Sequence, residues 1–172
     1  MSKPLRRWFL VVLLLCVPMV GMIVSARRAI AHFRGTDDPP MSLRVDLSER
    51  EMHVIEDGEV VRTYGVAIGT RKHPTPTGRF RTGRIEWNPR WVPPPVEWAR
   101  RLKARAGGDP RNPMQGVKIY FRAPWYFIHG TNDPASIGSA ASHGCLRMRT
   151  EEAKELAREI SKRGSVSLVI QP

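Results

Sequence analysis

The sequence predicts a mainly β domain with two peripheral helices, preceded by one N-terminal transmembrane helix. Three observations lead to this fold class. Apolar and polar residues alternate with period two from position 43 onward, as in half-buried strands. The chain holds 15 Pro and 14 Gly, a content that favours turns over long helices. Its 172 residues suit one domain with a hydrophobic core, and an uncharged run at residues 8–26 stands before that domain.

The uncharged run at residues 8–26 has the length of a membrane span. As a helix it would extend about 28 Å, close to the thickness of a bilayer's hydrocarbon core. Basic residues flank it on both sides, namely Lys3, Arg6, Arg7, Arg27 and Arg28. We therefore expect a single-pass signal anchor in the cell membrane, with residues 1–7 in the cytoplasm and residues 27–41 as a linker. Residues 42–172 would form a folded domain on the periplasmic or extracytoplasmic side.

Two other interpretations of the N-terminus stay open. Ala29-Ile30-Ala31 resembles a cleavage site for a signal peptide, but the two arginines just before it are unfavourable for cleavage. A lipoprotein site at Cys16 is disfavoured because the bulky Leu15 precedes it. The length of the apolar run fits an uncleaved anchor best.

The chain is strongly basic. Its formal net charge is +12, of which +4 lies in residues 1–42, so +8 remains for the folded part. Such a surplus attracts polyanions, whether nucleic acid, anionic lipid or an acidic wall polymer. The sequence contains no recognised nucleic-acid-binding motif, so we expect no nucleic acid partner.

The first part of the domain is predicted to be an antiparallel sheet. Apolar residues alternate with polar ones over 43–47, and two more β-rich runs follow at 52–55 and 60–68. Asp57-Gly58 stands between these two runs and is a strong signal for a tight hairpin.

The middle of the domain is interrupted by two Pro-rich passages. Residues 73–78 are expected to form a rigid loop, because each Pro removes a backbone donor, and a strand follows at 79–85. Pro94 or Pro95, at the end of the second passage, would open a short helix that runs to about residue 104. Gly107-Gly108 would end that helix.

The last part of the domain is predicted to hold strands at 117–120, 126–128 and 165–170 around a C-terminal helix. Thr150 is the expected N-cap of this helix, acidic residues occupy its first turn, and Gly164 follows its basic last turn. Four residues give the helix one apolar face: Ala153, Leu156, Ala157 and Ile160.

Cysteine usage singles out one thiol. The chain has two cysteines, and Cys16 lies within the apolar N-terminal run, where it is a poor disulfide partner for Cys145. An unpaired thiol in an oxidising compartment indicates a reactive group, whereas the structural alternative is a small buried hydrophobic residue.

One short segment brings chemically active residues together around Cys145. His129 or His143 could take the thiol proton, so we expect an ionised and accessible sulfur. Gly144 permits a sharp bend where backbone N–H groups can hold an oxyanion. Arg147, two residues further on, would face the same side as Cys145 and could bind a carboxylate. The residues alone do not choose between the two histidines as the base.

A zinc site is the other interpretation of this segment. His129, His143 and Cys145 are three possible ligands, but no fourth ligand lies nearby in the sequence. We therefore expect neither a metal nor a cofactor.

The same segment resembles the L,D-transpeptidase catalytic domain, also called the YkuD domain. The match consists of His129 followed by Ser142-His143-Gly144-Cys145-Leu146-Arg147. Residues 43–70 resemble the family's opening hairpin, HPTPTGRF at 73–80 resembles one of its loops, and IHGTNDPASIG at 128–138 surrounds its histidine. The resemblance covers residues 42–172 and implies the β-sandwich or barrel of this family.

The resemblance also implies roles for individual residues. Cys145 would be the nucleophile, His129 the general base with its ring steered by the carbonyl of Gly130, and His143 a further catalytic residue. Four residues would contact the substrate or the oxyanion: Gly130, Ser142, Gly144 and Arg147.

The implied reaction is acyl transfer on peptidoglycan stem peptides. Cys145 would attack a stem tetrapeptide, release D-Ala and form a thioester, which the amine of a second stem would resolve into a 3→3 cross-link. Water as the acceptor would give an L,D-carboxypeptidase, and a protein amine would attach a lipoprotein to the wall. A catalytically idle wall-binding module is a further alternative. Two stretches depart from the family's pattern. Residues 118–126 are bulkier than expected, and residues 88–116 are more basic and richer in Pro. The second departure leaves the identity of the acceptor open.

Overall fold

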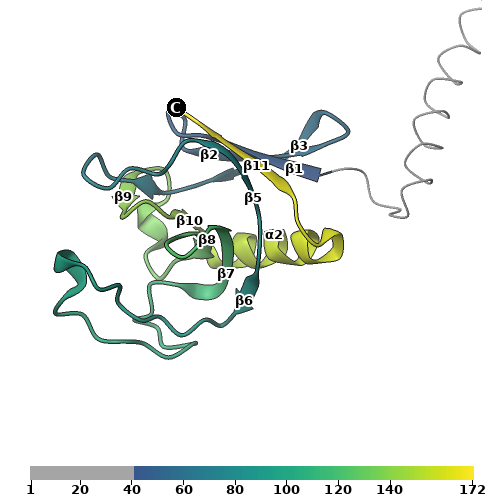
Figure 1. The fold of residues 1–172 in the computed structure, drawn as a ribbon. Helices are drawn as coiled ribbons and strands as arrows, with labels where there is room; N and C mark the ends of the chain where they lie inside the picture. The colour runs from purple at the N-terminus through teal and green to yellow at the C-terminus, as the bar shows by residue number, and fades with distance from the viewer. Residues whose placement is uncertain (1–40) are drawn as a thin grey trace, which may run out of the picture. The chain divides into compact units, whose positions relative to one another are not determined.

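The computed structural model describes residues 41–172 (Figure 1). The predicted cytoplasmic segment 1–7, the anchor 8–26 and the linker up to residue 40 lie outside the described residues. Within 41–172, none of the helical segments is long and apolar enough to cross a bilayer.

Five strands form the first sheet, in the order β3-β2-β1-β11-β5. β1 (Met41–Asp46), β2 (Glu51–Glu56) and β3 (Glu59–Gly65) are antiparallel neighbours, which confirms the predicted opening sheet. Asp57 and Gly58 join β2 to β3 with φ angles of 52° and 86°, as a two-residue hairpin requires. β11 (Ser167–Gln171) pairs in parallel with β1 and antiparallel with β5 (Gly78–Arg81).

Four strands form the second sheet, in the order β10-β8-β7-β6. They are β6 (Ile85–Trp87), β7 (Gln115–Arg122), β8 (Tyr126–Gly130) and β10 (Leu146–Met148). β7 and β8 confirm the two strands predicted there, and β10 runs parallel to β8. Two short strands, β4 (Ile68–Gly69) and β9 (Ala140–Ser142), pair separately in parallel.

One hydrophobic core joins the two sheets to the helix α2 (Thr150–Arg163). α2 packs against β7 and β8, and its buried face consists of the residues that the periodicity predicted: Ala153, Leu156, Ala157 and Ile160. Leu43 and Val45 of β1 and Ile119 of β7 are buried in the same cluster. Because apolar surface removed from water stabilises by about 25 cal/mol per Å², this shared core holds the strands that carry the site in fixed positions.

The predicted helix up to about residue 104 is wrong. The structure has only the 3-10 turn η1 (Glu97–Ala99) in that region, and α2 is the single α-helix of residues 41–172, not one of two. The physical reason is a tertiary contact. Trp91 and Arg105 exchange both backbone hydrogen bonds, each 2.9 Å long. The chain must therefore turn back to Trp91 by Arg105, so a helix that continued to residue 104 could not form this pairing.

Two finer predictions also need correction. The strand expected at 79–85 is two strands in different sheets, β5 and β6. The N–H of Thr82 donates to Val166, which directly precedes β11 of the first sheet, whereas the N–H of Gly83 donates to Tyr120 of the second sheet. Thr150 is the first residue of α2 and not its N-cap. Its hydroxyl donates to the carbonyl of Thr131 over 3.2 Å instead of capping the helix.

Candidate active site

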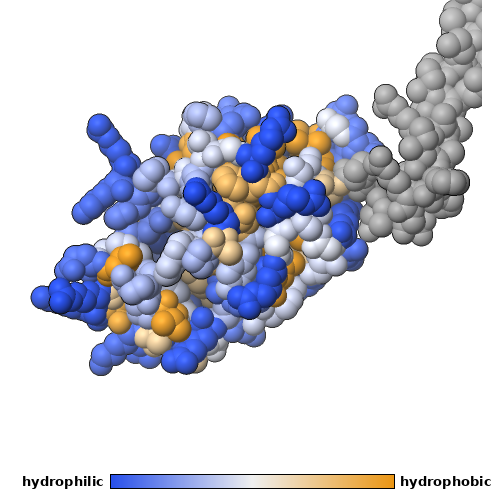
Figure 2. All heavy atoms as spheres, in the orientation of Figure 1, coloured by the Kyte–Doolittle hydropathy of each residue, from blue (hydrophilic) through white to orange (hydrophobic). Residues whose placement is uncertain are grey.

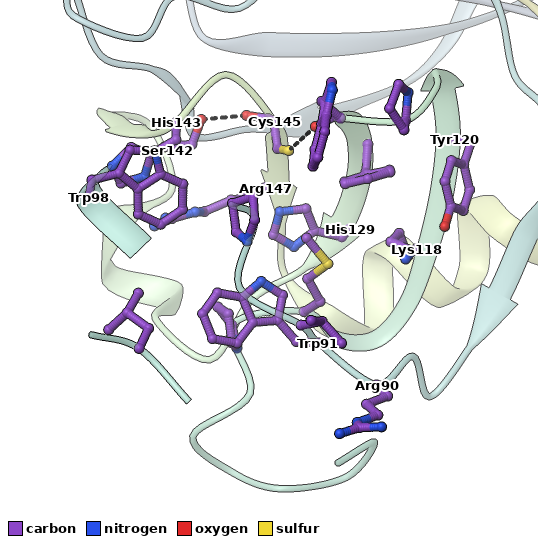
Figure 3. Close-up of a pocket in the computed structure, with 18 residues that line it drawn as sticks. Arg90, Trp91, Trp98, Lys118, Tyr120, His129, Ser142, His143, Cys145 and Arg147 are labelled. Carbon is purple, nitrogen blue, oxygen red and sulfur yellow. Dashed lines mark hydrogen bonds between the residues drawn. The ribbon is translucent and has the colours of Figure 1, made fainter. Parts of the chain in front are cut away.

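Cys145 and His129 are brought together by the parallel pairing of β10 with β8. In that register Arg147 lies beside His129, and Leu146 lies beside Ile128. Because side chains alternate along an extended chain, Cys145 faces the same side as Arg147 and therefore the same side as His129. Figure 3 shows the sulfur of Cys145 and the ring of His129 turned toward one cavity, with Arg147 beside them.

The turn before Cys145 is fixed by Ser142. The buried Ser142 hydroxyl donates to the carbonyl of Cys145 over 2.6 Å and accepts the N–H of Gly144 over 3.0 Å. Gly144 has a φ of 105°, and a Cβ there would lie 2.8 Å from the ring of Tyr126. Only glycine fits such a position. Ser142 thus shapes the turn that presents the thiol, and its hydroxyl is already used for that purpose.

The imidazole of His129 is oriented by the backbone carbonyl of the next residue. Its Nδ1 donates to the carbonyl of Gly130 over 2.9 Å. Since a carbonyl can only accept, Nδ1 carries the proton and Nε2 is left as the basic nitrogen. This hydrogen bond is the one that the family resemblance implied. Gly130 itself has no room for a side chain, because a Cβ would overlap the Gln115 carbonyl and crowd Thr150.

Burial keeps both reacting groups neutral in the free protein. Desolvation is the main reason that the pKa of the Cys145 thiol rises to about 11, with partial compensation from a backbone hydrogen bond with Phe127 and from the nearby cations Arg147 and Lys118. Desolvation likewise lowers the pKa of His129 to about 4. The half-buried sulfur also donates to the Trp125 carbonyl over 3.6 Å. The sequence-based expectation of an ionised sulfur is therefore wrong for the unliganded state.

His143 lies at the exposed rim of the site and not beside the thiol in the sheet. Its ring stacks on Trp98, with centroids 3.8 Å apart and planes 15° apart, and leans on His73 at 4.8 Å. Burial and the charges of His73 and Arg147 lower its pKa. Among the described residues, its ring has no hydrogen-bonding partner to fix it as His129 is fixed. The structure therefore favours His129 as the base on geometric grounds.

Arg147 presents a cation to the same site. Its backbone is held by two 2.9 Å hydrogen bonds with Ala67. Its half-buried guanidinium lines the pocket and has no hydrogen bond or ion pair with any side chain in residues 41–172. A desolvated guanidinium without a protein partner is suited to bind a carboxylate of a ligand.

The cavity in front of Cys145 has a volume of about 610 Å³. One wall is the segment 88–114, which contributes aromatic and apolar side chains including Trp91 and Trp98, and Trp125 lines the cavity as well. Figure 2 shows apolar residues surrounded by hydrophilic ones over this segment. Its exposed apolar side chains are Val92, Val96, Trp98 and Leu102. Sequence reasoning noted the Pro-rich, basic character of the segment but did not place it at the site.

Lys118 of β7 also lines this cavity and was not among the predicted site residues. It is buried, with 9% of its surface exposed, and Figure 3 shows it on the far side of His129 from Arg147. The signal in the sequence was a lysine among the apolar residues of a predicted strand, where a buried ammonium requires an oppositely charged partner.

The zinc alternative has no ligand cluster to support it. Within residues 41–172, the only group of metal-capable side chains gathered within ligand distance is Glu49, Glu51 and His53, which do not line the cavity. The three candidate ligands therefore do not form a zinc site in this arrangement.

Comparison with known proteins agrees with this geometry. Residues 40–168 match the L,D-transpeptidase catalytic domain family. The YkuD protein of Bacillus licheniformis, assigned by name to the L,D-transpeptidases, is 31% identical over 150 residues, which are 86% of this chain and 78% of that protein. The YqjB protein of Bacillus subtilis, named in the same way, is 35% identical over 121 residues, 67% of this chain and 64% of that protein.

The fold has relatives among solved structures as well. An L,D-transpeptidase from Mycobacterium smegmatis superposes with a TM-score of 0.58 at 18% sequence identity, over 78% of this chain and 59% of that one. This similarity concerns the fold, and the chain spans about three fifths of that protein's length. With the family match covering most of the described residues, the chain belongs to the L,D-transpeptidase catalytic domain family.

Proposed function

We propose that this chain is an L,D-transpeptidase that acts on peptidoglycan stem peptides through a thioester at Cys145. The observation that carries this proposal is the shared face of β8 and β10, where the thiol and the oriented imidazole of His129 open into one cavity. A thiol beside a base that a third group holds in place is the arrangement that acyl transfer requires. The names of its relatives support the same reaction.

In the first half-reaction, Sγ of Cys145 bonds to the carbonyl carbon of the L,D amide while Nε2 of His129 takes the thiol proton. The carbonyl oxygen becomes an oxyanion. The N–H of Gly144 is already donated to Ser142, so we assign the neighbouring N–H of Cys145 as the donor to that oxygen. Breakage of the C–N bond then releases the amine of D-Ala with the proton from His129, and the thioester remains.

The neutral state of both groups fits a proton transfer that accompanies attack. At pH 7 the thiol, with a pKa of about 11, and the imidazole, with a pKa of about 4, hold no ion pair that a substrate would have to disrupt. Transfer of the proton as the C–S bond forms avoids a separate, desolvated thiolate. The energy of the new thioester comes from the amide bond that is broken, so no nucleotide is consumed.

Arg147 supplies the recognition of a stem-peptide carboxylate. Its guanidinium lies in the cavity without a hydrogen-bonding or ion-pair partner in residues 41–172, and a bidentate pair with a carboxylate would satisfy it. The substitution Arg147→Met would therefore raise KM for the donor more than it lowers kcat, whereas His129→Gln would lower kcat.

The second half-reaction depends on the acceptor. An amine of a second stem gives the 3→3 cross-link, a protein amine attaches a polypeptide to the wall, and water gives an L,D-carboxypeptidase. The apolar wall at 88–114, with Trp91 and Trp98 facing the cavity, favours an organic acceptor over water because it excludes solvent from the thioester.

The test is incubation of the full-length chain with a disaccharide-tetrapeptide, followed by mass spectrometry. Loss of D-Ala together with a dimer supports the transpeptidase, and loss of D-Ala with tripeptide alone supports the carboxypeptidase. Cys145→Ala should abolish both products. Binding to sacculi without any product, in the wild type as in Cys145→Ala, would instead favour the wall-binding module.

We further propose that residues 8–26 anchor the chain in the cell membrane as a single pass, with the catalytic domain on the periplasmic or extracytoplasmic side. The substrate lies there, and the length and flanking charges of the segment support an anchor. Protease added to spheroplasts should digest residues 42–172. Complete protection of the domain in intact spheroplasts, with digestion after lysis, would contradict this topology.

A further inference from the structure

Four polar side chains form a row across the second sheet at the active site. Strand pairing places Glu86 of β6 opposite Lys118 of β7, Lys118 opposite His129 of β8, and His129 beside Arg147 of β10. Paired residues point to the same face of a sheet, with Cβ atoms about 5 Å apart. The base is therefore flanked by a cation on each neighbouring strand, and an acid stands at the end of the row.

Lys118 is held in this row as a charged group. Its Nζ lies 2.6 Å from Oε2 of Glu86, and the rings of Tyr120 and Phe127 lie 4.7 and 4.9 Å from Nζ. The side chain is 11% exposed, so the ammonium is largely removed from solvent. A buried lysine needs such partners to stay protonated. Its charge consequently sits at a fixed position next to the imidazole.

Glu86 neutralises Lys118 only in part, because its carboxylate also forms an ion pair with a second cation. Its other carboxylate oxygen pairs with Arg84 and accepts from the Tyr120 hydroxyl over 3.2 Å. The cluster of Arg84, Glu86 and Lys118 thus keeps a net positive charge beside His129. Removal of Glu86 would expose His129 to more of that charge, and removal of Lys118 would leave Arg147 as the one cation paired beside it on a neighbouring strand.

We propose that Lys118 is a positioning residue of this active site, which keeps the imidazole of His129 unprotonated and favours the thiolate of Cys145, and that Glu86 limits the strength of that effect. A cation near a neutral base disfavours its protonation, and the same cation stabilises a nearby anion. The inference rests on the proposed roles of Cys145 and His129. It adds a residue that acts through the imidazole and the thiol and takes no part in the bond changes itself.

Other ionisable groups near the pair act on it as well and stay constant in the test. They are Arg147 of β10, His143 with His73 at the rim, Arg90 on the segment 88–114, and Tyr120 and Tyr126 of the two central strands. Desolvation and Arg147 also act on the pKa of both Cys145 and His129, and Lys118 acts in the same direction as Arg147. Substitution of Lys118 or Glu86 changes only one charge among them.

The experiment measures the pH midpoint for alkylation of Cys145 by iodoacetamide in the full-length chain, read by mass spectrometry on the peptide that contains Cys145, so that Cys16 does not contribute. No substrate is needed, so the readout is independent of transpeptidation. Lys118→Met should raise the midpoint by about half to one pH unit, and Glu86→Gln should lower it by a similar amount. Titration of His129 by NMR should move in the same direction in each variant.

The controls separate charge from structure. Lys118→Arg keeps the charge and should stay near the wild-type midpoint, while Lys162→Met makes the same chemical change on an exposed part of α2 and should not move it. If the pair only fastened β6 to β7, Lys118→Met and Glu86→Gln would both lower the melting temperature and leave the midpoints unchanged. Unchanged midpoints, or shifts of the same sign in the two variants, would overturn the inference. If Lys118→Met does not fold, an unchanged midpoint in Glu86→Gln suffices to overturn it.

Discussion

At the scale of single residues, the site depends on backbone positions as much as on reacting groups. The thiol is presented by a turn whose glycine has a φ of 105° and whose hydrogen bonds converge on the Ser142 hydroxyl. The imidazole is oriented by a carbonyl one residue away. These constraints set where Sγ and Nε2 lie before any substrate arrives, which is the condition for efficient acyl transfer.

Gly144→Ala should inactivate the enzyme while the fold survives. The new methyl group would meet the Tyr126 ring 2.8 Å away, and an L residue at that φ adds strain of about 1 to 3 kcal/mol. We expect a loss of D-Ala release of at least about 100-fold, because misplacement of a nucleophile by about 1 Å has that effect. Gly58→Ala is the matched control, since Gly58 has a φ of 86° but open space around it. Similar activity losses in the two variants would contradict this explanation.

The sequence grouped Cys145, His129 and Arg147 in one predicted site, but it predicted neither Lys118 nor the ionisation of the reacting pair. Cys145, His129 and Arg147 could be identified because their spacing resembles a known family and because residues two apart in a strand share a face. The neutral thiol could not, since its raised pKa comes from burial by segments distant in sequence. Lys118 was missed for the same reason, because only the register of β7 with β8 places it opposite His129.

At the scale of elements, local patterns succeeded wherever neighbours in sequence are also neighbours in space. The hairpin at Asp57-Gly58 was predicted from its turn residues between two β-rich runs, and the apolar face of α2 from its helical period. The helix at 94–104 was wrong because the contact between Trp91 and Arg105 overrides local propensity. Residues 79–85 divide between β5 and β6 for a similar reason, because the chain pairs first with a strand of one sheet and then with a strand of the other.

Within the segment 88–114, the side chain of Asn112 joins three separate parts of the chain. This buried side chain donates to the carbonyls of Pro89 and Ala106 over 2.9 and 3.0 Å and accepts the N–H of Met114 over 2.8 Å. Loss of these bonds leaves the buried carbonyl of Pro89 unsatisfied, at a cost of about 1 to 3 kcal/mol. Asn112→Ala should therefore loosen this wall and raise KM, while kcat changes less.

Limited trypsin digestion checks the loosening directly. Cleavage near Arg100 and Arg101 should be several times faster in Asn112→Ala than in the wild type, because local opening exposes the chain. Asn132→Ala is the control, since the exposed Asn132 makes only a 3.4 Å hydrogen bond to Pro110. Equal cleavage rates in all three proteins would show that Asn112 does not hold the wall.

At the scale of the whole molecule, the two neutral reacting groups link stability to pH. His129 has a pKa of about 4 in the folded chain against 6.5 for an ordinary histidine, so the unfolded chain binds the extra proton first as pH falls. Above pH 6.5 the neutral, buried His129 makes its full contribution to the free energy of unfolding. That contribution falls by about 3 kcal/mol as the pH drops from 6.5 to about 4. Cys145 acts oppositely, because its pKa rises from 9.0 to about 11 and its contribution is lost as pH rises through that interval.

The expected result is a stability plateau between about pH 6.5 and pH 9, set by these two groups. Urea unfolding at a series of pH values measures it. Other groups titrate too, so the difference between the wild type and each variant is informative. His129→Gln should flatten the acid side and Cys145→Ala the alkaline side. Parallel pH curves for the wild type and both variants would show that folding shifts the pKa of neither group.

The whole molecule uses one core to fix the relative position of two strands, and those strands carry a nucleophile and its base. The decisive measurement is the rate of thioester formation on the full-length chain with a disaccharide-tetrapeptide, with the adduct mapped by mass spectrometry. We predict an adduct on Cys145, formed at least about 100-fold more slowly in His129→Gln and with a smaller loss in His143→Gln. An adduct on any other residue, or a larger loss in His143→Gln than in His129→Gln, would contradict the assignment of Cys145 and His129 as the reacting pair.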